Sequence, residues 1–129
     1  MSHRDMTQPL AFVLYEKLLP GSQLVNRLQD AGYRVQTVPS PDALVSSAEA
    51  EKPMVVLADL SSTHAKIAEV IGKLRQNAAT SHIPVIAFAE EKETALQEAA
   101  RNAGATLVVN DAAILTHLQP FLEQALRVD

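Results

Sequence analysis

The feature that most constrains the fold is a regular alternation between short apolar segments and segments with helical periodicity. Five segments have the composition of β-strands: 10–15, 33–38, 54–60, 83–89 and 105–110. Each is followed by a stretch in which apolar residues recur every three or four positions, as Ile67, Val70, Ile71 and Leu74 do. Strict strand–helix alternation predicts a parallel sheet covered by helices on both faces.

The composition of the strands also predicts their order in the sheet. Segments 10–15 and 54–60 are the most continuously apolar and are expected at its centre, whereas 33–38 alternates like an edge strand. With right-handed crossovers, this favours the order 2-1-3-4-5. The predicted fold class is a three-layer α/β sandwich of five βα units, flavodoxin-like, over residues 10–129, with residues 1–9 as a flexible tail.

Glycine, proline and serine mark the expected helix ends. Gly32 and Gly104 are predicted to stop the first and fourth helices. Ser40 is the predicted N-cap of a helix that begins at Pro41 and runs to about residue 50. For the C-terminal segment we expect a single helix over about 112–127, with a distortion near Pro120.

Composition excludes several functional classes. The 129 residues carry a net charge of −4, no cysteine and only two Tyr and three Phe as aromatics. No basic cluster is present, so binding to nucleic acid or to an anionic membrane is not expected. The absence of cysteine excludes disulfides and thiol nucleophiles. Apolar runs are far shorter than the ~20 residues that span a bilayer, and the first nine residues lack a signal-peptide core, so we expect a cytoplasmic protein.

One edge of the predicted sheet gathers the candidate functional residues. In open parallel sheets ligands bind at the carboxyl ends of the strands, beside the point where the strand order reverses. The residues expected at this edge are Tyr15, Glu16, Asp59, Ala89, Asn110 and Asp111. Asp59 is notable because it ends an apolar strand, where an ionised carboxylate is costly to bury unless water, a metal or a phosphate can reach it.

The order and spacing of AFVLYE, AGYRV, KPMVVLADL, IPVIAFA and AGATLVV resemble the receiver domains of bacterial response regulators, the CheY-like fold. The resemblance covers nearly the whole chain. It implies that an acid pair after the first strand holds Mg²⁺ and that an Asp at the end of the third accepts a phosphoryl group. It also implies that a Thr or Ser after the fourth strand and a Lys after the fifth bind that group.

Carried over by position, Asp59 matches the phospho-acceptor and Glu16 the second member of the acid pair, so these two could hold Mg²⁺. The other positions of the pattern depart from the family. Tyr15 replaces the first acid, Ala89 the hydroxyl residue, Asp111 the lysine, and Val108 the aromatic residue that reports the switch in many receivers.

These departures predict an impaired switch. Phosphoryl transfer adds negative charge beside existing acids, and its catalysis depends mostly on positioning and charge neutralisation. Asp111 in place of a cation reverses the sign of one contribution, unless another cation such as Lys17 reaches the site. The primary hypothesis is therefore a stand-alone pseudo-receiver that needs no cofactor and acts by protein–protein interaction.

Two alternatives remain. One is a working receiver, phosphorylated on Asp59 by a histidine kinase with Mg²⁺; the other is a small hydrolase that uses Glu16, Asp59 and Asp111. The expected partner is a sensor kinase or a downstream signalling protein, or a second copy in a homodimer. By resemblance, the segments Glu93–Arg101 and Thr116–Gln124 are the expected contact surface.

The remaining polar residues suggest no further site. The four histidines, His3, His64, His82 and His117, fall in separate segments and predict no metal centre. The run Ser61–Thr63 could be a phosphorylated loop like that of anti-sigma-factor antagonists, but a helix cap accounts for it more simply.

Overall fold

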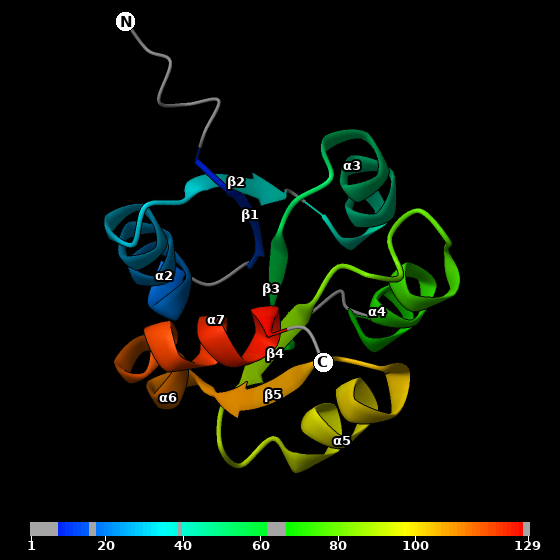
Figure 1. Cartoon of the computed structure of the whole chain (residues 1–129). Helices are drawn as coiled ribbons and strands as arrows, with labels where there is room; N and C mark the ends of the chain where they lie inside the picture. Colours follow the sequence, from blue (N-terminus) through cyan, green and yellow to red (C-terminus); the bar gives the residue numbers. More distant parts are fainter. Residues whose placement is uncertain (1–7, 16–17, 39, 62–66, 128–129) are drawn as a thin grey trace, which may run out of the picture.

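A computed structural model describes residues 8–15, 18–38, 40–61 and 67–127, with the side chains of 18–20 excepted. These residues contain a parallel five-stranded sheet of order β2-β1-β3-β4-β5, which confirms the predicted order (Figure 1). The strands are β1 (Leu10–Leu14), β2 (Arg34–Val38), β3 (Val55–Asp59), β4 (Val85–Ala89) and β5 (Leu107–Asn110). All residues of β1, β3 and β4 are buried, as the apolar composition of these three central strands predicts.

Helices cover both faces of the sheet (Figure 1). They are α2 (Leu18–Asp30), α3 (Leu44–Glu51), α4 (Ile67–Gln76), α5 (Thr94–Ala103), α6 (Asp111–Thr116) and α7 (Leu118–Leu126), with a 3₁₀ turn, η1 (Pro41–Ala43), ahead of α3. Helices α3, α4 and α5 pack on one face, and α2, α6 and α7 on the other. None of the helices in the described part of the chain has both the length and the apolar character that a membrane span requires.

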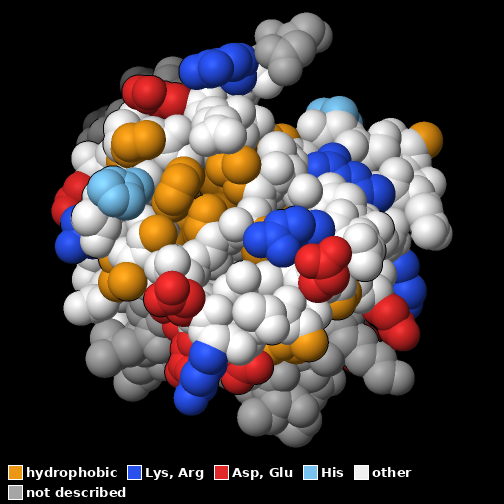
Figure 2. Space-filling model, turned by 90° about the horizontal axis from the view of Figure 1, so that it is seen from below, with side chains coloured by type: hydrophobic (Ala, Val, Ile, Leu, Met, Phe, Trp, Pro, Cys, Tyr) orange, Lys and Arg blue, Asp and Glu red, His pale blue; other side chains and the backbone are white. Residues whose placement is uncertain are grey.

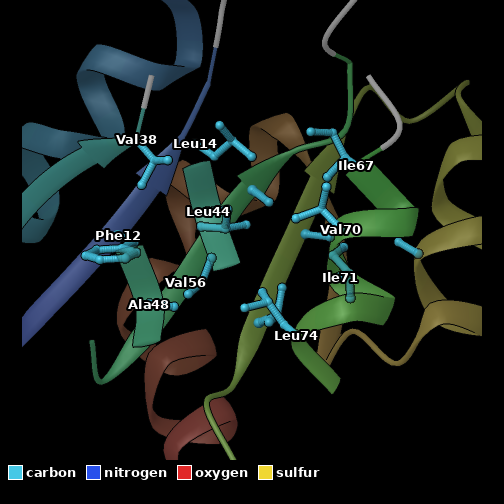
Figure 3. Packing of buried hydrophobic residues seen from close by; sticks show 14 of the residues in the cluster. Phe12, Leu14, Val38, Leu44, Ala48, Val56, Ile67, Val70, Ile71 and Leu74 are labelled. Atoms are coloured by element: carbon cyan, nitrogen blue, oxygen red, sulfur yellow. The ribbon is translucent and has the colours of Figure 1, made fainter. Parts of the chain in front are cut away.

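Two hydrophobic cores hold these layers together. On the first face, Leu44 of α3 and Ile71 and Leu74 of α4 point toward the sheet, in the same core as Phe12 and Val56 of the central strands (Figure 3). All four apolar residues predicted to form one stripe of α4 are buried. On the second face, side chains of α2, α6 and α7 cover Leu57 and Phe88. Because successive strand residues alternate between the faces, both cores use the same strands.

The register aligns the carboxyl ends of the strands. Leu14 is paired with Ala58, Asp59 with Phe88, and Ala89 with Asn110. The residues that follow or end β1, β3, β4 and β5 therefore reach the same edge, as the sequence predicts.

Two helix ends follow the predicted signals and one start does not. Gly104 ends α5 in the left-handed region (φ 106°), and Gly32 lies two residues beyond α2 with φ 98°. These are conformations that glycine adopts without steric cost. Ser40 precedes η1, but its side chain forms no capping hydrogen bond, and the segment begins as a 3₁₀ turn before α3.

The prediction of one C-terminal helix is wrong. The segment forms α6 and α7, separated at His117, whose φ and ψ of −120° and 32° are not helical. Pro120 lies in the first turn of α7, where a missing N–H costs nothing, and its ring excludes the carbonyl of Thr116 from a continuous helix. The helix therefore ends at Thr116, four residues before the proline, and a new one begins.

Candidate functional site

Asp59 lies at the carboxyl edge of the sheet and is almost completely buried, with 1% of its surface exposed. Its Oδ1 accepts a hydrogen bond from the Ser61 backbone N–H at 2.9 Å. Its Oδ2 is buried and has no hydrogen-bond partner among the described residues. The ion pairs among the described residues are Lys92–Glu90 and Arg101–Glu98, and neither includes Asp59. A buried carboxylate oxygen in this state is able to accept a ligand.

Ser61 is a site residue that the sequence did not single out by itself. Its hydroxyl is buried and has no hydrogen-bond partner among the described residues. The contact between its N–H and Asp59 spans two residues, the pattern of an Asx turn. In the sequence, the signal for this turn is the spacing Asp-x-Ser at the end of a strand. The other residues of the predicted helix cap, Ser62 and Thr63, lie outside the described residues, as does His64.

Tyr15 follows β1 and occupies the position of the first acid of the receiver pattern. Its half-buried ring packs against the core on the side of α2. The ring lies directly over Gly21 of α2, because a Cβ added at Gly21 would be only 2.6 Å from Cε2 of the ring and closer still to other ring atoms. The inference that Tyr15 is a packed ring is consistent with this contact. Because Gly21 has no side chain, α2 can lie this close to the Tyr15 ring.

The positions after β4 and on β5 provide no hydroxyl or aromatic group. Ala89 ends β4 and is fully buried in the first core. Val108 lies on β5, is half-buried and packs against the same core. The methyl group of Ala89 cannot donate a hydrogen bond, so this wall of the site is apolar.

Asn110 and Asp111 join β5 to α6 without an intervening loop. Asn110 is the N-cap of α6, and its Oδ1 accepts a hydrogen bond from the Ala113 N–H at 2.8 Å. Asp111 is the first helical residue, one position earlier than the predicted start at 112. A carboxylate is favoured in the first turn of a helix because the N–H groups there are positive ends of peptide dipoles. Asp111 therefore has a structural reason to occupy this position.

Of the two metal ligands in the hypothesis, Glu16 and Asp59, only Asp59 lies among the described residues. Glu16 and Lys17 lie outside the described residues. In the described part, no three His, Cys, Asp or Glu side chains gather closely enough to hold a metal ion. Mg²⁺ needs six oxygen ligands in near-octahedral geometry, and Asp59 Oδ2 is one candidate. The described residues therefore do not by themselves fit a magnesium centre.

An apolar surface lies beside this edge. We define the β5 patch as Leu107, Val109, Leu115 and Phe121, which are hydrophobic residues of β5, α6 and α7 that pack on the same core and remain partly exposed. Figure 2 shows hydrophobic side chains gathered in the middle of the face that contains β5, with charged side chains around them. Among the strands of the described residues, β5 pairs with β4 alone, and none of them covers its other edge.

Solved structures with the same architecture are receiver domains and response regulators. A candidate response regulator from Chloroflexus aurantiacus superposes with a TM-score of 0.84 at 16% identity, covering 92% of this chain and 98% of that one. The receiver domain of a sensor histidine kinase from Pseudomonas aeruginosa, with magnesium coordinated in its active-site cleft, gives a TM-score of 0.82 at 18% identity, with the same coverage. A response regulator from Burkholderia multivorans gives a TM-score of 0.67 at 26% identity, covering 90% of this chain and 95% of that one.

Sequence comparison adds no closer relationship, since neither a protein-family model nor a curated protein matches the chain. The structural agreement nevertheless extends over the whole sheet and its order. It confirms the fold expected from the resemblance. The chain has the CheY-like fold of response-regulator receiver domains.

Proposed function

We propose that this chain is a receiver-like domain of bacterial two-component signal transduction that works in the cytoplasm as a pseudo-receiver. It binds a protein partner, and its conformation does not depend on phosphorylation of Asp59. The observation that carries the proposal is the charge around Asp59: no described cation pairs with this buried carboxylate.

The electrostatic reason follows from the chemistry of phosphoryl transfer. The phosphoryl group of a phosphorylated aspartate carries about two negative charges, and positive groups must neutralise them. Two unit charges about 4 Å apart interact by roughly 4 kcal/mol at an effective dielectric constant of 20. Replacing a favourable Lys contact by the carboxylate of Asp111 therefore changes an attraction of this order into a repulsion. Ala89 in addition provides no hydroxyl for the phosphoryl group.

The β5 patch is the proposed partner surface. The segments expected to make contact, Glu93–Arg101 and Thr116–Gln124, lie largely in α5 and in α6–α7, on either side of β5. An apolar centre with a polar rim is the usual organisation of a protein interface. A sensor kinase or a downstream signalling protein would bury the patch, and a second copy of the chain could use the same surface.

A second candidate is a working receiver, which one observation favours. Asp59 Oδ2 and the Ser61 hydroxyl are buried without partners among the described residues, and an ion or a phosphoryl oxygen could satisfy both. In this alternative Glu16 and Asp59 would hold Mg²⁺, as the magnesium-bound receiver of Pseudomonas aeruginosa suggests.

An NMR titration with beryllofluoride and Mg²⁺ distinguishes the two candidates, because beryllofluoride mimics a phosphoryl group on an aspartate. For the pseudo-receiver we expect no saturable shifts of Asp59, Ala89 or β5 amides beyond those that Mg²⁺ alone produces.

The matched control is Asp59→Asn, which removes the acceptor charge with little change in volume. Saturable shifts that spread from Asp59 to β5 in the natural chain and disappear in Asp59→Asn would overturn the pseudo-receiver and establish the working receiver.

A further inference from the structure

A hollow in the described part of the molecule lies at the opposite edge of the sheet from Asp59. It has a volume of about 840 Å³, within the range of roughly 300–1,000 Å³ typical of small-molecule sites. Its lining residues begin or precede strands, including Leu10 of β1, Arg34 of β2, Pro84 before β4 and Thr106 before β5. The end of α7, with Leu126 and Arg127, completes the wall.

The floor of this amino-edge pocket is apolar. Leu10, Pro53 and Ile83 are buried beneath it. Met54 also lines the pocket and is 48% exposed, which makes it the one large hydrophobic residue exposed to solvent among the described residues. Methionine is flexible and polarizable, so it adapts to the shape of an apolar ligand.

The rim is cationic. Among the described residues, the cations that line the pocket are Arg34, Lys52, Arg75 and Arg127, and the one acid that lines it is Glu51. The whole chain is acidic, with a net charge of −4. This segregation of charge makes the pocket attractive to anions.

The rim cations have few internal partners. The side chains of Lys52 and Arg127 are exposed and form no hydrogen bond or ion pair with the described residues, and Arg34 donates one bond of 3.3 Å to the Gln8 carbonyl. Arg75 is different, because its guanidinium donates to the carbonyls of Gly104 and Ser81. It therefore contributes charge to the wall, and the other three are available to a ligand.

The helix dipole explains only part of this clustering of cations around the pocket. Lys52 and Arg127 follow the carboxyl ends of α3 and α7, where cations are mildly stabilising. However, Lys52 has a left-handed backbone (φ 53°), a position that glycine or asparagine usually fills. A helix dipole does not account for the exposure of Met54 or for Arg34, which begins a strand.

From the charge and the apolar floor together, we propose that the amino-edge pocket binds a small amphipathic carboxylate. Its apolar body lies on Leu10, Met54 and Leu126, and its carboxylate faces Arg34, Lys52 and Arg127. This site does not involve Asp59, so the inference is independent of whether the domain is phosphorylated.

The test is a ¹H–¹⁵N NMR titration of the full chain with 4-phenylbutyrate, compared with 4-phenylbutylamine and 4-phenylbutanamide, which have the same body but a positive or neutral head. We expect saturable shifts at Leu10, Met54 and Ile83 with a Kd on the order of 1 mM, as the size of the probe suggests. The amine should bind at least about tenfold more weakly, because its charge is repelled by the rim.

Two variants with the same charge change locate the site. The exposed residue Lys52 lines the pocket, whereas Lys73 is exposed on α4 and lies outside its lining. Lys52→Glu should weaken 4-phenylbutyrate binding at least about fivefold, and Lys73→Glu less than about twofold.

The proposal fails if 4-phenylbutyrate does not bind at about 20 mM, the result expected if a segment of this chain fills the pocket. It also fails if the amine binds equally well, if the shifts map to the β5 patch, or if the two lysine variants behave alike.

Discussion

At the scale of single residues, the contact between Tyr15 and Gly21 shows how one substitution changes an edge of the sheet. A receiver has an acid at the position of Tyr15, and an acid requires solvent or a metal. The Tyr15 ring instead packs against the core and over the backbone of α2. The site loses a candidate metal ligand and gains an apolar wall, which supports the proposal that phosphoryl chemistry is impaired here.

This contact predicts that Gly21→Ala destabilises the fold by roughly 1–3 kcal/mol, because the added methyl group overlaps the Tyr15 ring. The measurement is the free energy of unfolding from urea denaturation followed by circular dichroism. Gly72→Ala in α4 is the matched control, since a Cβ there meets no atom within 4 Å. It should be neutral or stabilise by up to about 1 kcal/mol, because alanine favours helix.

A double variant isolates the clash. In a Tyr15→Ala background, Gly21→Ala should cost at least about 1 kcal/mol less than in the natural chain, because the two residues are in contact. Equal costs in both backgrounds would show that the ring does not lie over Gly21.

At the scale of elements, the carboxyl end of α4 is joined to three other segments by one side chain. Arg75 donates to the carbonyls of Gly104 (2.7 Å), Ser81 (2.7 Å) and Ile83 (3.2 Å) and to Thr106 Oγ1 (2.6 Å). Partial burial lowers the pKa of the Arg75 guanidinium, but an arginine side chain remains charged at neutral pH. This network fixes the ends of α4 and α5 against the starts of β4 and β5.

Arg75→Met should therefore destabilise the fold by about 2–4 kcal/mol, because it retains most of the apolar stem and removes every donor. Arg101→Met is the control, since Arg101 forms only an exposed contact with Glu98 at 3.4 Å, and its loss should cost less than about 0.5 kcal/mol. The comparison uses urea denaturation at neutral pH. Similar losses for the two variants would mean that the Arg75 network adds no stability.

At the scale of the whole molecule, the described residues at the two edges of the sheet differ in charge. Asp59 and Asp111 lie at the carboxyl edge, and Arg34, Lys52, Arg75 and Arg127 lie with one acid, Glu51, at the amino edge. The proposed pseudo-receiver follows from this charge, since a phosphoryl group at the carboxyl edge would lie beside these acids. The proposed carboxylate site lies at the amino edge, where the lining cations outnumber the lining acid.

If the charge of the carboxyl edge is what silences the switch, reversing it should restore a response. We expect the double variant Tyr15→Asp with Asp111→Lys to show saturable beryllofluoride and Mg²⁺ shifts around Asp59 that the natural chain lacks. The control pairs Tyr15→Asp with Ala112→Lys, which adds the same charge at the exposed next residue. If a folded Asp111→Lys variant stays silent, the missing lysine is not what impairs the site.

The sequence by itself determined the class of fold, the order of the strands and the place of Asp59 at the carboxyl edge. It could do so because periodicity and apolar content report the burial of each segment from residues that are neighbours in the chain. The same local signals identified Gly104 as the stop of α5 and the buried stripe of α4.

Only the tertiary structure decided which polar atoms have partners and where the surface is hollow. The four bonds of Arg75 join residues up to 31 positions apart, and the amino-edge pocket combines residues at or just before the start of each strand with residues of α7. Pro120 in the sequence left open a kinked helix or two helices, and the structure shows two, α6 and α7. Such contacts are set by the packing of distant segments, and no local pattern in the chain encodes them.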